Sequence, residues 1–387
     1  MRFNSRWFVI GVAVPVLAAG LTLAGVQVAS GEADCDASEA YRYVAGGDGV
    51  PEGKDADTPS TERYSTQLLN EHLKTQDPVV WPGPWCEYST AKDKATSDDY
   101  QHSGNPTQQS EAWNKTPRLI TLTLGRQNST IIDHVDKCFK NIKDHDFLDA
   151  NVCALAVLAN QNAFNTLRND LSVILNDYKV QQDRVDPRLI VAVTGYFNPY
   201  NSATTVATKI PGFCADLQDT IPTCIARWIL LPPALITLDQ VVKKLNDTIE
   251  PVVKQFTISS QGRFFFVNPY EKFKDHCMQM NVEIKTKVYH PTNTVHDHNA
   301  TKNFGCDEGK SWIASDKTDG TKTPFLYLTP AVTGVLILAT QTTKDMGINP
   351  NKKGHDCIAQ MIWEATKNKL GVPEKPLADS EICSDPK

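Results

Sequence analysis

Short apolar runs alternate along this chain with stretches that repeat apolar residues at helical spacing. The runs are residues 41–45, 118–124, 188–193 and 263–267, and they are rich in β-branched and aromatic side chains. Helical patterns cover residues 61–73, a segment starting near Ser129, and residues 147–178, 235–256 and 354–370. Strands that alternate with helices favour a parallel sheet covered by helices on both faces. The sequence therefore predicts a three-layer α/β/α fold with a mainly parallel sheet.

The rest of the chain shows no repeat and no clear linker. We therefore expect one domain over residues 40–387, with insertions around 277–306 and 314–345 that disulfides close into loops. The polar stretch 89–113 is expected to be a loop. The apolar stretches 227–236 and 324–339 are each expected to be buried segments, or alternatively an apolar wall or lid over an acyl chain.

The amino terminus indicates export. Arg2 and Arg6 precede an uncharged and largely apolar run from residue 7 to residue 30, with small residues at its end. This pattern is typical of a signal peptide, and the run is also just long enough to span a bilayer. We expect residues 1–30 to be a signal peptide or an N-terminal membrane anchor, residues 31–39 to be a spacer, and the protein to be secreted, extracellular or attached to the cell surface.

The 10 cysteines agree with export, because disulfides persist in oxidising compartments. None of them forms a Cys-x-x-Cys motif, so a zinc or redox site has no support. Pairing in sequence order is the prediction: Cys35–Cys86, Cys138–Cys153, Cys214–Cys224, Cys277–Cys306 and Cys357–Cys383. The net charge of −6 argues against a nucleic-acid partner, and we expect a monomer.

The run 41–45 leads into a glycine-rich turn, Gly46-Gly47-Asp48-Gly49. In an α/β protein, the carboxyl end of the first strand is where catalytic elbows lie. This stretch resembles the first block of the secreted SGNH (GDSL) ester hydrolases, where a strand ends in Gly-Asp-Ser and the serine is the nucleophile. Later segments resemble further blocks of that family, especially of its actinobacterial-type esterases: 100–105, 120–128, 193–196, 273–277, 312–313 and 347–355.

The resemblance covers roughly residues 40 to 370 and implies an SGNH-hydrolase-like, flavodoxin-like fold. It also implies that the catalytic side chains of the family are missing. The nucleophile position holds Gly49, the base position holds Asn349, and the acid position holds Met346, with Asp345 one residue out of register. The family's oxyanion donors correspond to Gly104 and to Gln127 or Asn128. The expected ligand-binding residues are accordingly Asp48, Gly49, Gly104, Gln127, Asn128 and Asn349.

Other residues are candidates to replace the missing groups. Asp48 either activates water or only caps a helix and holds the turn. His355 is a candidate base, but the family position supports packing, and His276 resembles a non-catalytic position. The cluster His290, His296 and His298 has the spacing of metal ligands but is expected on an exposed disulfide loop, so neither a metal nor a cofactor is predicted.

Two functions are compatible with these residues. The first is a secreted SGNH-hydrolase-like protein, inactive or strongly impaired as a catalyst, that binds an acyl ester, a lipid or an acylated glycan. The alternative is an active extracellular esterase or lipase that uses groups other than the family serine and histidine.

Overall fold

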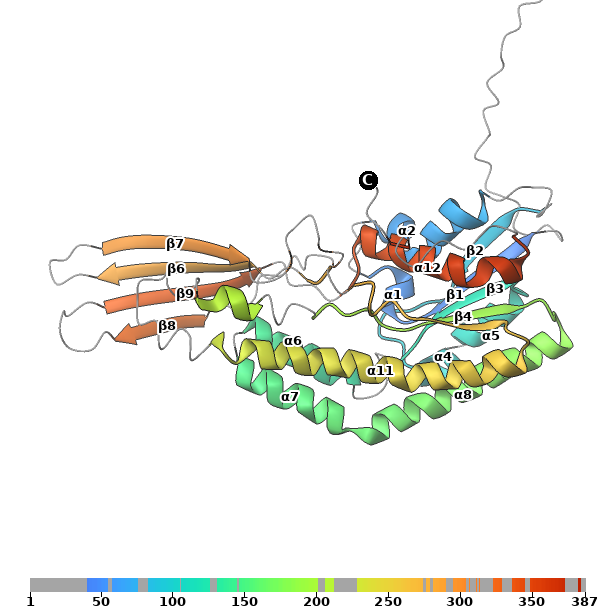
Figure 1. Cartoon of the computed structure of the whole chain (residues 1–387), viewed down its shortest axis with the longest axis horizontal. Helices are drawn as coiled ribbons and strands as arrows, with labels where there is room; N and C mark the ends of the chain where they lie inside the picture. The colour runs from blue at the N-terminus through green and yellow to red at the C-terminus, as the bar shows by residue number, and fades with distance from the viewer. Residues whose placement is uncertain are drawn as a thin grey trace, which may run out of the picture.

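The structure is a computed structural model of the whole chain (Figure 1). It describes residues 40–54, 58–75, 83–104, 106–125, 131–144, 146–200, 206–211, 228–273, 276–278, 281–289, 295–303, 306, 311, 313, 323–328, 336–344, 349–372 and 382–383.

The body of the molecule is built on a 5-stranded parallel sheet in the order β2-β1-β3-β4-β5. Its strands are β1 (Tyr41–Gly47), β2 (Trp85–Ser89), β3 (Leu119–Thr123), β4 (Ile190–Thr194) and β5 (Phe264–Val267). β3 and β4 are buried along their whole length, as their apolar sequences predicted. The order reverses between β1 and β3, and ligands of doubly wound folds bind beside this reversal, at the carboxyl ends of the strands.

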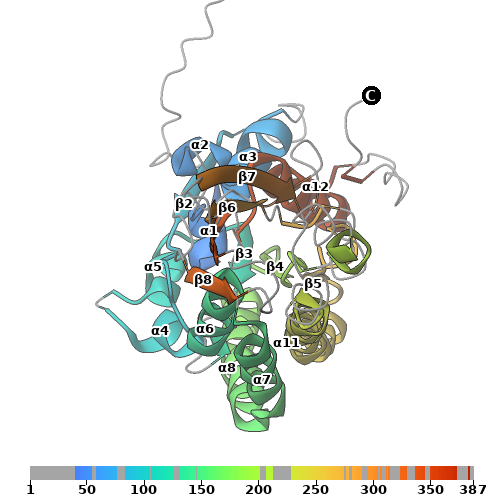
Figure 2. The same cartoon turned by 90° about the vertical axis from the view of Figure 1, so that its left-hand side faces the viewer.

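Helices cover both faces of this sheet, which confirms the predicted three-layer α/β/α architecture (Figure 2). One face carries α2 (Pro59–Glu62), α3 (Tyr64–Gln67), the π-helix η1 (Leu68–Leu73) and α12 (Lys352–Leu370). The other carries α4 (Ser97–His102), α5 (Gln108–Asn114), α6 (Ile131–Lys143), α7 (Phe147–Ala159), α8 (Gln161–Arg184) and α11 (Leu231–Ser259). A further short helix, α1 (Gly49–Glu52), directly follows β1.

A second, 4-stranded antiparallel sheet, in the order β7-β6-β9-β8, extends from one end of the body (Figure 1). Its strands are β6 (Asn281–Tyr289), β7 (Val295–Asn303), β8 (Thr323–Leu328) and β9 (Leu336–Lys344). They come from the two stretches predicted as separate loop insertions, and pairing of β6 with β9 joins both stretches in one sheet. The histidine cluster was expected on a loop. His296 and His298 instead occupy alternate positions of β7, and His290 lies outside the described residues.

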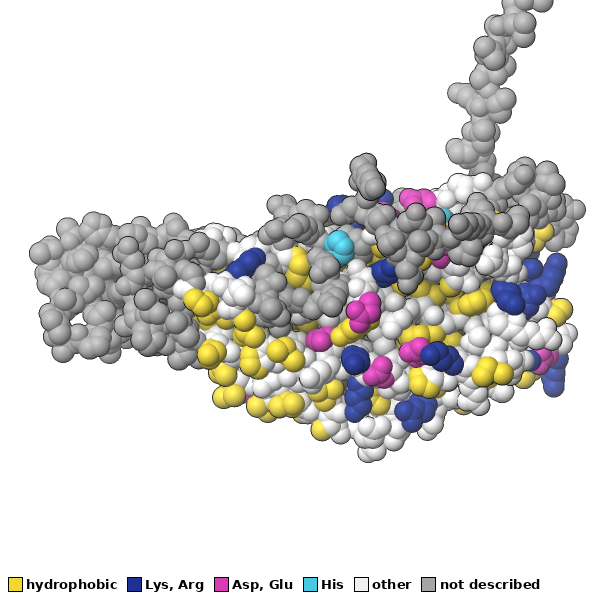
Figure 3. Space-filling view, in the orientation of Figure 1, with side chains coloured by type: hydrophobic (Ala, Val, Ile, Leu, Met, Phe, Trp, Pro, Cys, Tyr) yellow, Lys and Arg dark blue, Asp and Glu magenta, His cyan; other side chains and the backbone are white. Residues whose placement is uncertain are grey.

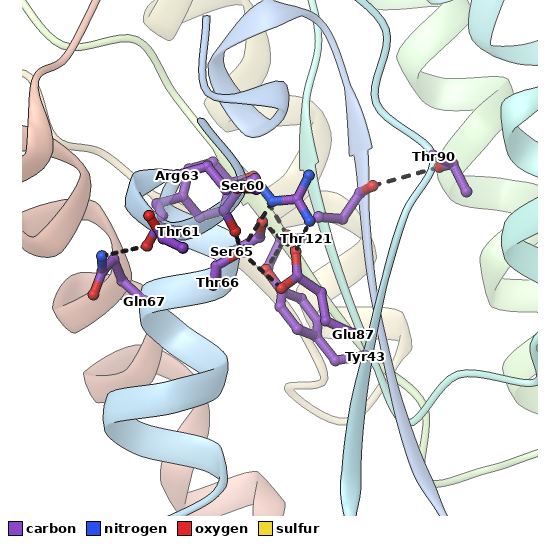
Figure 4. A network of polar contacts seen from close by, with 12 residues as sticks. Tyr43, Ser60, Thr61, Arg63, Ser65, Thr66, Gln67, Glu87, Thr90 and Thr121 are labelled. Atoms are coloured by element: carbon purple, nitrogen blue, oxygen red, sulfur yellow. Dashed lines mark hydrogen bonds and ion pairs between the residues drawn. The ribbon is translucent and has the colours of Figure 1, made fainter. Parts of the chain in front are cut away.

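Several predicted boundaries were wrong. The predicted helix 61–73 is broken at Arg63, whose backbone is extended, and continues as α3 and η1. At this break Arg63 joins a polar network, in which its guanidinium lies 3.0 Å from Glu87 of β2 (Figure 4). Ser65 and Thr66 also donate to the Glu87 carboxylate, so this network holds α3 against the sheet edge.

The predicted helix 147–178 is two helices, α7 and α8. Asn160 separates them, and its side chain caps α8 by accepting from the Ala163 N–H. The predicted loop 89–113 contains α4 and α5, which begin at the capping residues Thr96 and Thr107. Strand β2 was not predicted, because it is a short edge strand whose last residues are partly exposed.

Three of the predicted disulfides are present: Cys138–Cys153, Cys277–Cys306 and Cys357–Cys383. The first joins α6 to α7, and the third fixes the C-terminal segment to α12. Cys86 is also disulfide-bonded. Cys35, Cys214 and Cys224 lie outside the described residues, so the two remaining predicted pairs stay predictions.

Candidate functional site

Asp48 holds the turn at the carboxyl end of β1. One carboxylate oxygen caps α1 by accepting from the Val50 N–H at 3.0 Å, and the other accepts from the Tyr196 hydroxyl at 2.6 Å. Its backbone N–H donates to the Thr123 carbonyl at 3.0 Å. Asp48 is almost fully buried. These contacts give it the structural role of cap and turn holder, and they tie β1 to the loop after β4.

Gly49 is the first residue of α1 and is buried. A Cβ atom at this position would lie 2.9 Å from Oδ1 of Asp93 and 3.3 Å from Cβ and Cδ of Lys54. Lys54 and Asp93 form an ion pair, with Nζ 3.0 Å from Oδ2. A side chain at position 49 would therefore require the Asp93 carboxylate, the flexible end of a partly exposed side chain, to move aside.

A further carboxyl group, that of Glu52, belongs to the same cluster. Burial raises the pKa of Glu52 above its ordinary value, and the neighbouring Asp93 carboxylate raises it further. Its Oε2 is buried without a hydrogen-bond partner. Sequence patterns did not identify Glu52, Lys54 and Asp93, because Asp93 reaches the turn only through the loop that follows β2.

Asn349 lies just before α12 and is almost fully buried. The next turn is fixed by Asn351, which caps α12 by accepting from the Gly354 N–H at 3.1 Å and donates to the Ser311 carbonyl at 2.9 Å. The far end of α12 lies beside the start of β5, since Lys369 Nζ donates to the Gln261 carbonyl at 2.9 Å. The start of α12, and with it Asn349, therefore lies at the carboxyl edge of the sheet, the same edge as Gly49. An amide cannot take up a proton at neutral pH.

His355 cannot replace the missing base. It is fully buried, and its Nδ1 accepts from the backbone N–H of Tyr64 at 3.2 Å. This bond places the proton of the neutral ring on Nε2, which is buried without a hydrogen-bond partner. Burial lowers the pKa of His355 to about 3. The residue packs α12 against α3, which is the role that the resemblance implied.

The buried imidazole predicts a loss of stability in acid. The pKa of His355 is 6.5 without burial and about 3 in the folded protein, so below pH 6.5 the unfolded chain binds a proton that the folded protein does not. The free energy of unfolding should fall by about 2–3 kcal/mol between pH 7 and pH 4.5 from this group alone. Burial lowers the pKa of His72 to about 4, which acts in the same direction.

Urea unfolding at both pH values, on the parent and on His355→Asn, measures this effect. Asparagine keeps an acceptor near the Nδ1 position but does not titrate. The variant should lose about 2 kcal/mol less than the parent on acidification. Equal losses in both proteins would show that His355 does not resist protonation.

The remaining predicted positions are only partly described. Gly104 lies past the end of α4 with φ +94°, next to the Lys92 ammonium group rather than directly after a strand. His276 lies in the turn after β5, where its backbone N–H donates to the Phe273 carbonyl at 3.0 Å. Gln127, Asn128, Asp345 and Met346 lie outside the described residues.

No group of three or more His, Cys, Asp or Glu side chains within the described residues is arranged to hold a metal ion. In the same residues, no helix is long and apolar enough to cross a membrane. The predicted N-terminal segment, residues 1–30, lies outside them.

A small apolar pocket with a cavity volume of about 30 Å³ lies beside the turn. It is lined by Val135, Tyr196, Phe197, Pro199, Tyr200, Leu238, Val241, Val242 and Leu245. Tyr196 connects it to the turn, because the residue that lines the pocket also donates its hydroxyl to Asp48. The Tyr196 backbone is held by Asn246 of α11, which accepts from its N–H at 2.7 Å and donates to its carbonyl at 2.8 Å. The sequence placed Tyr196 in the segment 193–196 that resembles a family block, but not among the expected ligand-binding residues.

No family model matches the chain, and no curated protein matches it. Among solved structures it is similar to a lipase, Lip_vut3, from a goat rumen metagenome, with 12% identity and a TM-score of 0.37 over 60% of this chain and 83% of the lipase. It is also similar to an extracellular lipase from Streptomyces rimosus, with 16% identity and a TM-score of 0.37 over 81% of this chain and 94% of the lipase. Likenesses this weak identify neither family nor activity, so the site has to be judged from its own residues.

Proposed function

We propose that the chain is a secreted SGNH-hydrolase-like protein that binds an acyl ester or a related acylated lipid and has lost most or all of its hydrolytic chemistry. The observation that carries this proposal is the environment of Gly49. The residue begins a helix at the end of β1, where the family places its serine, and the Asp93 carboxylate of the Lys54–Asp93 ion pair lies against it.

The chemistry of acyl transfer explains why this substitution matters. An attacking serine needs a base that removes its proton, and donors that stabilise the oxyanion. Gly49 has no hydroxyl, and the Asn349 side chain cannot act as a base. The His355 ring is buried, so a substrate cannot reach it, and its lowered pKa makes it a weak base. Loss of nucleophile and base together leaves at most the contribution of binding and oxyanion donors, about 10³–10⁴ over water.

The apolar pocket supports the binding part of the proposal. Ligand pockets combine a mainly apolar lining with a few fixed polar groups that orient the ligand. Here the lining comes from α6, α11 and the loop after β4, and the polar groups at the adjoining turn are held by Asp48 and Tyr196. An acyl chain would enter this pocket only if the side chains that line it, which are almost fully buried, moved apart.

Binding of a soluble medium-chain fatty acid carrying a dansyl group tests the proposal. Val242 lies at the pocket and is slightly exposed, so Val242→Phe should fill the pocket and weaken binding about tenfold or more. Val252→Phe is the matched control, since Val252 is similarly buried on the same helix and does not line the pocket. Fluorescence titration of the three proteins gives the affinities. If both variants weaken binding equally, the loss of affinity comes from a less stable protein and not from a filled pocket.

A second candidate function is hydrolysis by unconventional groups, which the Glu52–Asp93–Lys54 cluster favours. A carboxyl with a raised pKa and an unbonded oxygen is a feature of general bases. Glu52→Gln is the variant that separates this candidate from the first, because it should abolish any activity of the parent.

A further inference from the structure

One face of α7 exposes large apolar side chains. Leu148, Val152 and Leu155 follow each other at helical spacing, and their exposed fractions are 57%, 56% and 50%. Asp149 is the one charged residue in the sequence of this helix. Soluble proteins usually place polar side chains on such a face, so an apolar face that is exposed indicates a contact with something else.

The start of α11 adds a second group of exposed apolar side chains beside the first. Ile229, Leu230 and Ile236 are exposed by 56%, 37% and 47%. The two helices pack together, and Thr237 of α11 donates to the Asn151 side chain of α7 at 2.7 Å. Figure 3 shows hydrophobic side chains gathered over this end of the molecule. We call the six residues the apolar platform: Leu148, Val152, Leu155, Ile229, Leu230 and Ile236.

The apolar platform adjoins the apolar pocket. Leu238 and Val241, which follow Ile236 on α11, line the pocket, and so does Val135 of α6. The Cys138–Cys153 disulfide fixes α6 to α7 between these two surfaces. Because α11 ends just before β5 begins and is much longer than the strands, its start lies beyond the carboxyl edge of the sheet, on the same side as the turn at Gly49. The pocket residues Leu238 and Val241 are buried and Ile236 is exposed, so the platform and the pocket lie on opposite sides of the same part of α11.

We propose that the apolar platform docks on the surface of a neutral lipid bilayer or micelle, from which an acyl chain enters the pocket. This inference rests on the proposed function, because it names the source of the acylated ligand. A second copy of the chain is the competing occupant. The platform exposes on the order of 500 Å² of apolar surface, less than the roughly 800 Å² that each partner buries in a stable interface.

The charges around the apolar platform favour neutral rather than anionic headgroups. On the neighbouring α6, Lys140 forms an ion pair with Asp144, and the Lys143 ammonium lies 5.3 Å from the ring centre of Phe139. Residues 131–144 contain as many aspartates as lysines, so this segment carries no net positive charge beside the platform. Docking should then depend on apolar contact and change little between low and high salt.

Flotation with phosphatidylcholine vesicles tests this inference on the full chain. The parent should float with the vesicles at both about 0.1 M and about 1 M salt, although the Debye length falls from about 10 Å to about 3 Å between them. The variant Leu148→Gln, Val152→Gln, Leu155→Gln should bind at least tenfold more weakly. The matched control is Val173→Gln, Val180→Gln, Val185→Gln, which removes comparably exposed valines from α8 and its end and should bind like the parent.

Three results would overturn the inference: a parent that does not float, an α7 variant that floats as well as the parent, or a parent that sediments as a dimer while the α7 variant is a monomer. Titration with the soluble dansyl fatty acid separates this failure from failure of the proposed function. If that probe binds but vesicles do not, only the docking surface is wrong. If vesicles bind but the probe does not, the proposed ligand pocket is wrong.

Discussion

Replacing Gly47 with alanine should destabilise the folded protein by at least about 3 kcal/mol, through a backbone clash added to a strained conformation. Gly47 ends β1 with φ +124°, a conformation that residues with a side chain rarely adopt. A Cβ atom would lie 2.1 Å from the Thr123 carbonyl oxygen. That oxygen belongs to the backbone of the central strand β3 and accepts from the Asp48 N–H, so it cannot move without opening the turn.

Gly371→Ala is the matched control for this prediction. Gly371 also has positive φ, +90°, at the end of α12, but nothing lies within 4 Å of the added Cβ. Its replacement should cost only the strain of the left-handed backbone, about 1 kcal/mol. Urea unfolding of both variants measures the difference. Similar costs at both positions would mean that β1 and β3 do not approach as closely as the structure shows.

The strands β1, β3, β4 and β5 could be predicted because each is a short run rich in apolar residues; the sheet buries β3 and β4 completely and most of β1. β2 could not, because its sequence, Trp85-Cys-Glu-Tyr-Ser89, mixes buried and partly exposed residues at an edge. The second sheet was also missed as a sheet. Its pairing of β6 with β9 joins segments that lie far apart in the sequence, and local patterns carry no signal for such contacts.

Breaks within helices were missed for a related reason. Helical periodicity continues through Arg63 and Asn160, although Arg63 leaves the helix to reach Glu87 and Asn160 caps the next helix. In each case a side-chain contact that periodicity does not register decides where the helix ends.

The turn Gly47-Asp48-Gly49 could be placed from sequence, because it directly follows a strand. The groups that surround it could not. Lys54 and Asp93 meet over Gly49 only after the chain has passed through β2, and Tyr196 reaches Asp48 from the loop after β4. The absence of a serine was visible in the sequence, but the ion pair that lies against Gly49 required the structure.

Restoring serine and histidine together should produce the largest change in activity. In the variant Gly49→Ser, Asn349→His, the hydroxyl would start α1 at the family position, and an imidazole would stand before α12. The backbone of Gly49 does not have a positive φ, so serine fits the conformation. The new side chain must displace the Asp93 carboxylate, whose side chain is about one third exposed and can turn towards solvent, and it packs 3.3 Å from Cβ and Cδ of Lys54.

We expect the double variant to hydrolyse esters on the order of 10²-fold faster than the parent. The full rate of a triad is not expected, because the proposed resemblance places Met346 at the acid position, and its thioether cannot orient the new histidine as a carboxylate would. Gly49→Ser, Asn349→Gln is the matched control: it carries the same nucleophile without a base and should stay close to the parent.

The most direct test of the proposed loss of chemistry is the initial rate of p-nitrophenyl ester hydrolysis by the purified parent, the double variant, its control and Glu52→Gln. We expect a parent at background, a double variant clearly above it, and a control that does not rise. An active parent that loses its rate in Glu52→Gln would contradict the proposal, and would show that the carboxyl cluster beside Gly49 is a working catalytic site.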